Sequence, residues 1–417
     1  MSGQPSLGDA LEVLLRYGAL MLRSGDAAFR VRDAVERLAP RLGVDHLELL
    51  VTVTGMTATA RRGPDQVTLV RHVGPLGIDA WRLGSLERLA DEPSSNLTPA
   101  ALGALLDAIE AAAPQHPTIV VAVAVGLASA CFSYLNGGNL AGGLAAFVAG
   151  GTGQLLRSLL LARHFNQFAV TGFCAAAAAG LYCVAAWLLG AAGLAPGHGV
   201  GVIAAVLFLI PGFPLVAALL DFLQHQAVAG LVRLAYATTL LLAAAFGLAM
   251  VILVASVALP VAEPQSTDLA LTIALRGAAS LIGGCGFAVL YNSAGRTVLA
   301  VGLLALLGNE LRLGLQDAGA SQPVATFVGA LLVGSLASLL RGRLPGTMMM
   351  TPRMVLTVPG IIIMVPGSYV FQSVVLFSRG DAIGGLQAAV QAAFVIGGMA
   401  LGLAASRFLS ERKWRYE

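Results

Sequence analysis

Charged side chains are scarce in this sequence, and lysine is almost absent. Only 11% of the 417 residues are Asp, Glu, Lys or Arg, whereas 57% are hydrophobic, and the mean hydropathy is +0.82. A chain with so little polar surface cannot fold as an ordinary water-soluble globule, so lipid has to be its main solvent. Lys413 is the single lysine, and the arginines that make up the rest of the positive charge occur in clusters.

Motifs for metals, nucleotides and hydrolysis are missing as well. The four cysteines lie inside apolar runs without C-x-x-C spacing, which indicates small buried side chains rather than disulfides or a metal site: Cys131, Cys174, Cys183 and Cys285. The sequence has no G-x-S-x-G and no P-loop. We therefore predict no enzyme, no metal or other cofactor, and no nucleic-acid partner.

Residues 1–115 differ from the rest and predict a small α+β domain. Apolar residues recur at helical spacing in Asp9–Arg23 and in Asp26–Leu42, with a Ser24-Gly25 break between them. Three short β-branched runs and two amphipathic helices follow, at His46–Thr54, Met56–Ala60, Gln66–His72, Ile78–Ala90 and Leu97–Ala113. No secretory signal precedes this arginine-rich segment, so we expect it in the cytoplasm.

From Thr118 onward the sequence has apolar runs long enough to cross about 30 Å of hydrocarbon as helices. We predict ten spans, at Thr118–Leu135, Asn139–Leu156, Phe168–Leu189, Val200–Leu220, Leu234–Leu259, Leu269–Leu290, Val298–Leu315, Val324–Leu340, Val355–Phe377 and Leu386–Ala405. Arginines concentrate in the loops on one side, whereas the other side holds only Arg312, Arg379 and an acidic loop at 261–268. The positive-inside rule then places both termini in the cytoplasm.

The membrane part contains a repeat, because its two halves match at a constant offset of 155 residues. Polar residues, Gly and Pro recur in this register: Gly153 with Gly308, Arg157 with Arg312, Gln167 with Gln322, Thr171 with Thr326, and Pro211-Gly212 with Pro366-Gly367. Each half, 116–262 and 263–417, has five predicted spans, an odd number. The second half must therefore enter the membrane from the opposite side, which predicts inverted repeats, a pattern typical of secondary transporters.

The Pro-Gly pairs fall inside the fourth predicted span of each half, with Pro214 and Ser368 beside them. Pro removes a backbone donor and Gly permits unwinding, so a break would free backbone groups at membrane depth. We expect broken helices whose N-terminal ends face a carboxylate substrate. A simple kink is the alternative at each position, although the symmetric pair favours the break.

Few other polar residues lie in the spans, and each one is a candidate for gating or coupling. The predicted outer side holds Arg276, Asn309, Glu310 and Arg312, of which Arg276 could also contact substrate. Their counterparts toward the inner side are Gln154 and Arg157. Asp221 and His225 could take part in a proton step. The alternatives are an arginine that snorkels to the interface, a glutamate at a span end, and a solvated helix face at Asp221 and His225.

The sequence resembles the threonine/serine exporter family in its fused form. Tyr17–Arg37 and Val51–Thr59 are similar to the soluble N-terminal signature, Leu209–Leu215 to the first membrane half, and residues 325–343 and 361–370 to the second. The resemblance implies an inner-membrane exporter of small polar metabolites such as threonine and serine, driven by the proton-motive force. Split relatives are associated with export of succinate-type dicarboxylates, so a small dicarboxylate is the alternative substrate. Asp26 departs from the Ser-Gly-Ala that is more usual in the family.

Our hypothesis is an antiporter-like exporter that binds a small amino or carboxylic acid at the two breaks. Its expected partners are the substrate, protons and the lipid bilayer, and a homo-oligomer remains open. A membrane-anchored enzyme or sensor is the rival, for which a Ser24, Asp26 and His46 grouping can be considered, although nothing in the spacing makes it catalytic. A passive channel is disfavoured because the sequence has no charged ring or filter-like segment.

Overall fold

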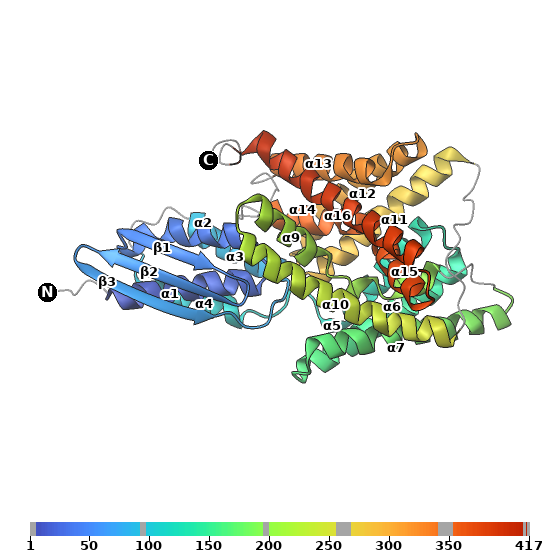
Figure 1. Cartoon of the computed structure of the whole chain (residues 1–417), viewed down its shortest axis with the longest axis horizontal. Coiled ribbons are helices and arrows are strands. Elements are labelled where there is room, and N and C mark those ends of the chain that lie inside the picture. Colours follow the sequence, from blue (N-terminus) through green and yellow to red (C-terminus); the bar gives the residue numbers. More distant parts are fainter. Residues whose placement is uncertain are drawn as a thin grey trace.

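Near its N-terminus the chain forms helices packed on a three-stranded sheet (Figure 1). The computed structural model describes residues 6–91, 97–194, 200–255, 268–340, 353–411 and 414. The first elements are α1 (Leu7–Arg23), α2 (Ala28–Leu38), β1 (His46–Val51), β2 (Gly55–Arg62), β3 (Asp65–His72), α3 (Ala80–Asp91) and α4 (Pro99–Ala111). We call residues 6–116 the N-terminal unit. Its helices and strands lie within a few residues of the predicted ranges.

The sheet is antiparallel in the order β1-β2-β3, and α1 and α2 pack on one of its faces. Alternate residues of β2 point toward those helices, so Met56, Ala58 and Ala60 are buried. Gly25 has φ +102, a left-handed conformation that suits glycine, and it makes the turn between α1 and α2.

Within the described residues, eight helices are long and apolar enough to cross a membrane. They are α5 (Thr118–Leu135), α6 (Leu140–Ala162), α7 (Gln167–Ala191), α10 (Ala227–Val254), α11 (Leu269–Leu290), α12 (Gly295–Asp317), α13 (Gln322–Leu340) and α16 (Ala382–Ser410). Large apolar side chains such as Trp187 and Phe246 are exposed on their outer faces, as contact with lipid requires. The chain is therefore an α-helical multi-pass membrane protein.

The other two predicted spans are interrupted. The first consists of α8 (Val200–Ala205), a 3-10 turn η2 (Leu207–Leu209) and α9 (Gly212–Leu223), and the second of α14 (Arg353–Ile361), η3 (Ile362–Met364) and α15 (Gly367–Ser378). The second pair bends by 49° and can count as one broken span, which gives nine among the described residues; ten spans stay a prediction. Arg341, Arg343, Arg412, Lys413, Arg415 and most of the acidic loop lie outside the described residues.

Element bounds recur at the offset of 155 residues that the sequence predicts. α6 and α12, η2 and η3, and α9 and α15 correspond at both ends, and α7 and α13 correspond at their first residues. Packing recurs too, because α7 contacts α10 as α13 contacts α16. Elements of the two halves also interlock: α5 packs on α11, α10 on α15, and α16 on α9.

Small residues allow the close approach of these helices. A Cβ on Gly247 of α10 would overlap with the carbonyl oxygen of Gly172 on α7. The same contact recurs 155 residues later, where a Cβ on Gly402 of α16 would overlap with the carbonyl oxygen of Phe327 on α13. Backbone atoms cannot rotate away as a side chain can, so larger residues at these two positions would force the helices apart.

We predict that Gly247→Leu destabilises the protein by about 1–3 kcal/mol or more, the usual range for overpacking. The measurement is the melting temperature of the purified chain in detergent. Gly180→Leu in α7 is the matched control, because its Cβ would meet nothing within 4 Å. Equal melting temperatures for the two variants would contradict the close approach of α7 and α10.

Candidate functional site

The two Pro-Gly pairs adopt the same backbone conformation. Pro211 has φ −78 and ψ 54, and Pro366 has φ −79 and ψ 52. In both, the N–H of the following glycine donates to the carbonyl oxygen of the residue before the proline, at 2.8 Å. These are inverse γ-turns. Each pair therefore interrupts its helix with a 3-10 turn followed by a γ-turn.

The two breaks pack against each other. A Cβ on Gly212 would overlap with the side chain of Ile362, and a Cβ on Gly367 would overlap with that of Ile210. Ile210 and Ile362 are 7% and 3% exposed, so the contact is buried and apolar, and we call it the barrier. The end of each isoleucine side chain lies where a side chain on the opposite glycine would begin, so a larger residue at either glycine would have to displace that isoleucine.

A cavity of about 220 Å³ opens on one side of this barrier. Its polar lining comes from α6, α7, α10 and the end of α11: Arg157, Gln167, Thr171, Tyr236 and Tyr291. Pro211 and Pro214 also line it. Gln167 Nε2 donates to Tyr236 Oη at 2.5 Å, which fixes two of these side chains. We call it the arginine cavity.

Arg157 gives this cavity its charge. No carboxylate among the described residues lies within ion-pair distance of the Arg157 guanidinium, and its electrostatic neighbours are Cys174, Tyr236 and Tyr291. An arginine in such a place has donors to offer to a ligand, and the planar guanidinium suits a carboxylate. The arrangement can bind a small anion.

A second cavity, of about 250 Å³, lies on the other side of the barrier. Its polar lining is Asn136, Gln322, Ser368, Tyr369 and Gln372, with no charged side chain among the described residues that line it. We call it the neutral cavity. Its Gln322, Tyr369 and Asn136 stand 155 residues from Gln167, Pro214 and Tyr291 of the arginine cavity. The two cavities are therefore counterparts in the repeat.

The N-terminal unit closes one side of the arginine cavity, to which Leu76, Gly77 and Ile78 contribute. The loop that contains these three residues is fixed within the unit, since Gly77 N donates to Arg23 O at 2.8 Å. It is also fixed to the second half of the chain, since Ala80 N donates to Tyr291 O at 2.8 Å. The unit thus bridges the mouth of the cavity.

Asp221, at the end of α9, holds the N-terminal unit from the first half. Helix α2 has no side-chain cap of its own, and Asp221 Oδ1 instead accepts from Ala28 N at 2.8 Å. Arg233 on α10 pairs with Asp221 at 3.2 Å and donates to the Asp26 carbonyl at 2.7 Å. Asp221 and Arg233 are 0% and 1% exposed. The predicted alternative of a solvated helix face is therefore wrong for Asp221.

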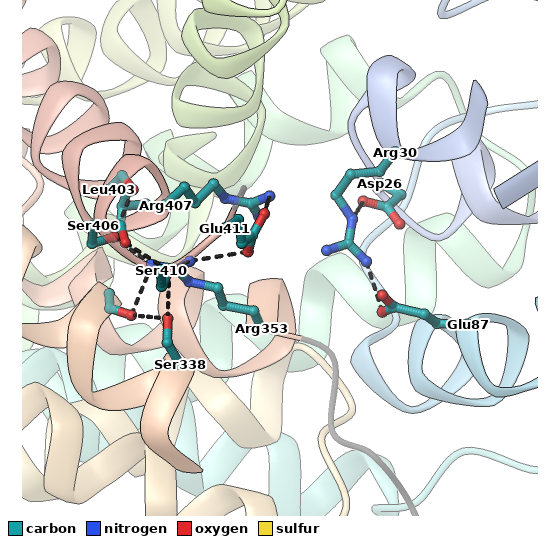
Figure 2. Close-up of polar contacts among 11 residues, drawn as sticks. Asp26, Arg30, Glu87, Ser338, Arg353, Leu403, Ser406, Arg407, Ser410 and Glu411 are labelled. Carbon is teal, nitrogen blue, oxygen red and sulfur yellow. Dashed lines mark hydrogen bonds and ion pairs between the residues drawn. The ribbon is translucent and has the colours of Figure 1, made fainter. Parts of the chain in front are cut away.

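Figure 2 shows further charges at this junction. In the N-terminal unit, Arg30 pairs with Asp26 at 2.8 Å and with Glu87 at 2.7 Å. Burial raises the pKa of the Asp26 carboxyl, and the Arg30 charge opposes that rise. Across from them, Arg353 of α14 pairs with Glu411, just beyond the end of α16, at 3.0 Å.

The end of the chain lies on the same side as the N-terminal unit. Phe29 of α2 packs edge-on against Trp414, with ring centroids 5.8 Å apart. The Arg407 guanidinium lies over both rings, at 5.5 Å from the Phe29 centroid and 5.3 Å from that of Trp414. Both ends of the described chain are therefore found at the face that carries the arginine cavity.

The predicted site residues are only partly brought together. Pro211, Pro214 and Arg157 line the arginine cavity, and Ser368 lines the neutral one, whereas Gly212 and Gly367 form the barrier beside Pro366. Arg276 lines neither cavity; it pairs with Asp317 at 2.6 Å. The other predicted residues, namely Gln154, Asn309, Glu310 and Arg312, lie on α6 and α12 outside both linings.

Sequence reasoning missed most of the polar lining of the cavities. Gln167 and Thr171 could have been found, because both recur in the repeat register as Gln322 and Thr326. Tyr236, Tyr291 and Asn136 carry no such signal, since their neighbours in the cavities come from distant helices.

Two broken helices between two cavities in a multi-pass helical protein define the class of membrane transporters. Two family models match the chain, "Putative threonine/serine exporter" at residues 12–255 and "Threonine/Serine exporter, ThrE" at residues 276–409. The chain belongs to the threonine/serine exporter family, as its sequence predicts. This membership identifies a transporter rather than an enzyme.

Curated relatives agree with this family. The chain is 28% identical over 418 residues to a probable threonine/serine exporter of Mycobacterium tuberculosis, which covers 96% of this chain and 76% of the relative. It is also 28% identical over 239 residues to the probable succinate transporter subunit YjjP of Escherichia coli, which covers 57% of this chain and 91% of the relative. No solved structure matches the chain.

We predict that Asp221→Ala destabilises the full chain by about 3–5 kcal/mol, because it leaves Arg233 buried without its carboxylate. A double-mutant cycle with Arg233→Met, read as melting temperature in detergent, should show a double variant less destabilised than the sum of the single ones. Glu36→Gln, which removes an exposed pair with Arg32, is the control and should change stability by under about 1 kcal/mol. Additive effects of the Asp221 and Arg233 variants would show that the two residues do not act together.

Proposed function

We infer that the protein is a secondary active exporter that binds the carboxylate of a small metabolite at Arg157. The observation that carries this proposal is a guanidinium that has no carboxylate partner in the described part of the chain and lies in a cavity next to a broken helix. Hydrogen bonds from an arginine to a carboxylate are charge-assisted and stronger than neutral ones. The nearby hydroxyl and amide groups of Thr171 and Gln167 suit the polar part of such a substrate.

The proposed architecture is ten spans in two inverted five-helix repeats, with domains at 1–115, 116–262 and 263–417. The recurrence of element bounds at 155 residues supports the repeat, and alternating access then follows from the two cavities, one at each face. We place the protein in a bacterial cytoplasmic membrane with both termini inside. The contact between Phe29 and Trp414 supports a common side for the two ends.

Threonine and serine are the first candidate substrates, on the name of the family. A small dicarboxylate such as succinate is the second, and one feature of the cavity favours it. An amino acid also carries an ammonium group, for which a carboxylate is the usual partner, yet no acidic side chain lines the arginine cavity among the described residues. The net positive cavity suits a substrate with net negative charge.

Coupling to protons is part of the proposal, and Glu310 is the residue that we assign to it. Its Oε1 is buried and has no hydrogen-bond partner among the described residues. A carboxyl in such a place can take up and release a proton as its surroundings change. Asp221 is less suited, because Arg233 and the N-terminus of α2 hold its charge.

We predict that Arg157→Gln weakens substrate binding by about 10- to 100-fold, the equivalent of one charge-assisted interaction. The measurement is transport of radiolabelled threonine, serine and succinate in proteoliposomes with an imposed pH gradient. Arg163→Gln changes an exposed arginine just beyond α6 and should leave transport unchanged. Unaltered transport of all three substrates by the Arg157 variant would show that the carboxylate binds elsewhere.

If protons drive export, collapsing the pH gradient and the membrane potential with an uncoupler should stop accumulation of substrate in the same proteoliposomes. Glu310→Gln cannot change its charge and should keep exchange of substrate for substrate while losing the response to the gradient. Gradient-driven accumulation at the wild-type rate by that variant would remove Glu310 from the coupling mechanism.

A further inference from the structure

Arg157 and Arg312 are counterparts in the repeat, yet they are held in different ways. They occupy the same position on α6 and α12, whose bounds correspond at both ends. Arg157 lines the arginine cavity, whereas Arg312 is not among the residues that line the neutral one. The difference bears on the proposed function, on which the following inference rests.

Arg312 is withdrawn from the neutral cavity by a chain of hydrogen bonds. Its Nε donates to Asn309 Oδ1 at 2.9 Å, and Asn309 Nδ2 donates to Ser280 Oγ at 2.8 Å. Ser280 in turn donates to the carbonyl of Arg276 at 2.7 Å. Asn309 and Ser280 are 0% exposed, so this chain lies in the protein interior. Such a buried and satisfied network fixes its members in place.

The acceptor equivalent to Asn309 Oδ1 in the first half is Gln154 Oε1, which accepts no hydrogen bond among the described residues. Gln154 precedes Arg157 by three residues, as Asn309 precedes Arg312. Gln154 is 5% exposed, and its Oε1 is buried with no partner among the described residues, while its Nε2 donates to Ser158 at 3.3 Å. A buried amide oxygen without a donor is unfavourable, so the site favours a conformation that would supply one.

Arg312 lies close to the neutral cavity even though it does not line it. Tyr369, which lines that cavity, is the side chain with which the Arg312 guanidinium interacts electrostatically. Tyr236 and Tyr291 have the same relation to Arg157 on the other side of the barrier. The Arg312 guanidinium therefore lies on the side of α12 from which it can approach the wall that Tyr369 forms.

We propose that Arg157 and Arg312 form a reciprocal arginine switch that moves the carboxylate site from one face to the other. In transporters with inverted repeats, access alternates by movement of one half against the other, and the switch requires that each half take up the side-chain arrangement of its counterpart. In the opposite state, Arg312 leaves Asn309 and binds the substrate carboxylate in what is here the neutral cavity. Arg157 then withdraws and donates to Gln154 Oε1.

The switch explains why the buried amide oxygen without a donor and the arginine that lines a cavity occur in the same half of the chain. Each state has one free guanidinium, at the open cavity, and one that is bound to the amide three residues before it. When one side closes, its arginine no longer holds the carboxylate, and the counterpart arginine binds it on the side that has opened.

The two halves differ in one respect that sets the balance of the states. The residue at the position of Ser280 in the first half is Val125, which cannot bond to Gln154. Asn309 is therefore held more firmly than Gln154, and this favours the state in which Arg312 is bound. Removing that bond should shift the protein toward the opposite state.

The test measures half-saturating concentrations of radiolabelled succinate and threonine from each face, in membrane vesicles of both orientations that contain the full chain. We expect Arg157→Gln to raise the value by about 10- to 100-fold at the face with the N-terminal unit and by less than about twofold at the other. Arg312→Gln should do the reverse. Arg163→Gln is the control and should change neither.

A second pair of variants separates the switch from a loss of folding. Asn309→Leu and Ser280→Val release Arg312, so they should lower the half-saturating concentration at the face opposite the N-terminal unit. That effect has the opposite sign to the effect of Arg312→Gln, although Asn309 and Arg312 are in contact. A folding defect would change all of these variants in one direction. Arg312→Lys keeps the charge and should recover part of the affinity.

The outcomes also separate the switch from the proposed function. If Arg157→Gln has its expected effect while Arg312→Gln changes neither face, the switch is wrong and the arginine cavity remains the binding site. If neither arginine variant changes either face, both the switch and the binding site are wrong. A wild-type protein that transports neither probe overturns the switch together with the proposed substrates.

Discussion

The contact between the two helix breaks is the interaction on which the rest of the structure depends. Lipid offers no partners to backbone N–H and carbonyl groups, so an irregular segment can exist at membrane depth only where protein or water surrounds it. Each break here is packed against the other, with Gly212 against Ile362 and Gly367 against Ile210. The barrier, the two cavities and the interlocked halves all follow from this arrangement, because each half needs the other to cover its broken helix.

The sequence predicted the breaks, the helices and the register of the repeat, since Pro-Gly pairs, apolar runs and a fixed offset are local signals. It did less well with the site. The sequence places Arg276 within a span and Arg157 just after one, and it does not show that Arg276 pairs with Asp317 while Arg157 lines a cavity. Asp221 reads as a residue at a helix end, but the N-terminal unit that covers it comes from the other end of the sequence. Such facts depend on tertiary contacts, which spacing along the chain does not contain.

The N-terminal unit breaks the symmetry that the membrane helices keep. Asp221 and Arg233 hold it, and the residues 155 positions later are Leu376 and Ala388, which have no charge to offer a second unit. The face with the neutral cavity consequently has no equivalent attachment. A repeat whose backbone is nearly the same in both halves thus has one face with a covering unit and one without, and a few side chains make the difference.

The cap that Asp221 supplies to α2 also has a consequence for biosynthesis. The two bonded residues are separated by 193 positions. A ribosome adds about 5–20 residues per second, so about 10–40 seconds pass between the synthesis of Ala28 and that of its acceptor. During translation the first turn of α2 is made long before the partner that completes it, and the nascent unit has to keep that end of the helix accessible until the membrane segments have been inserted.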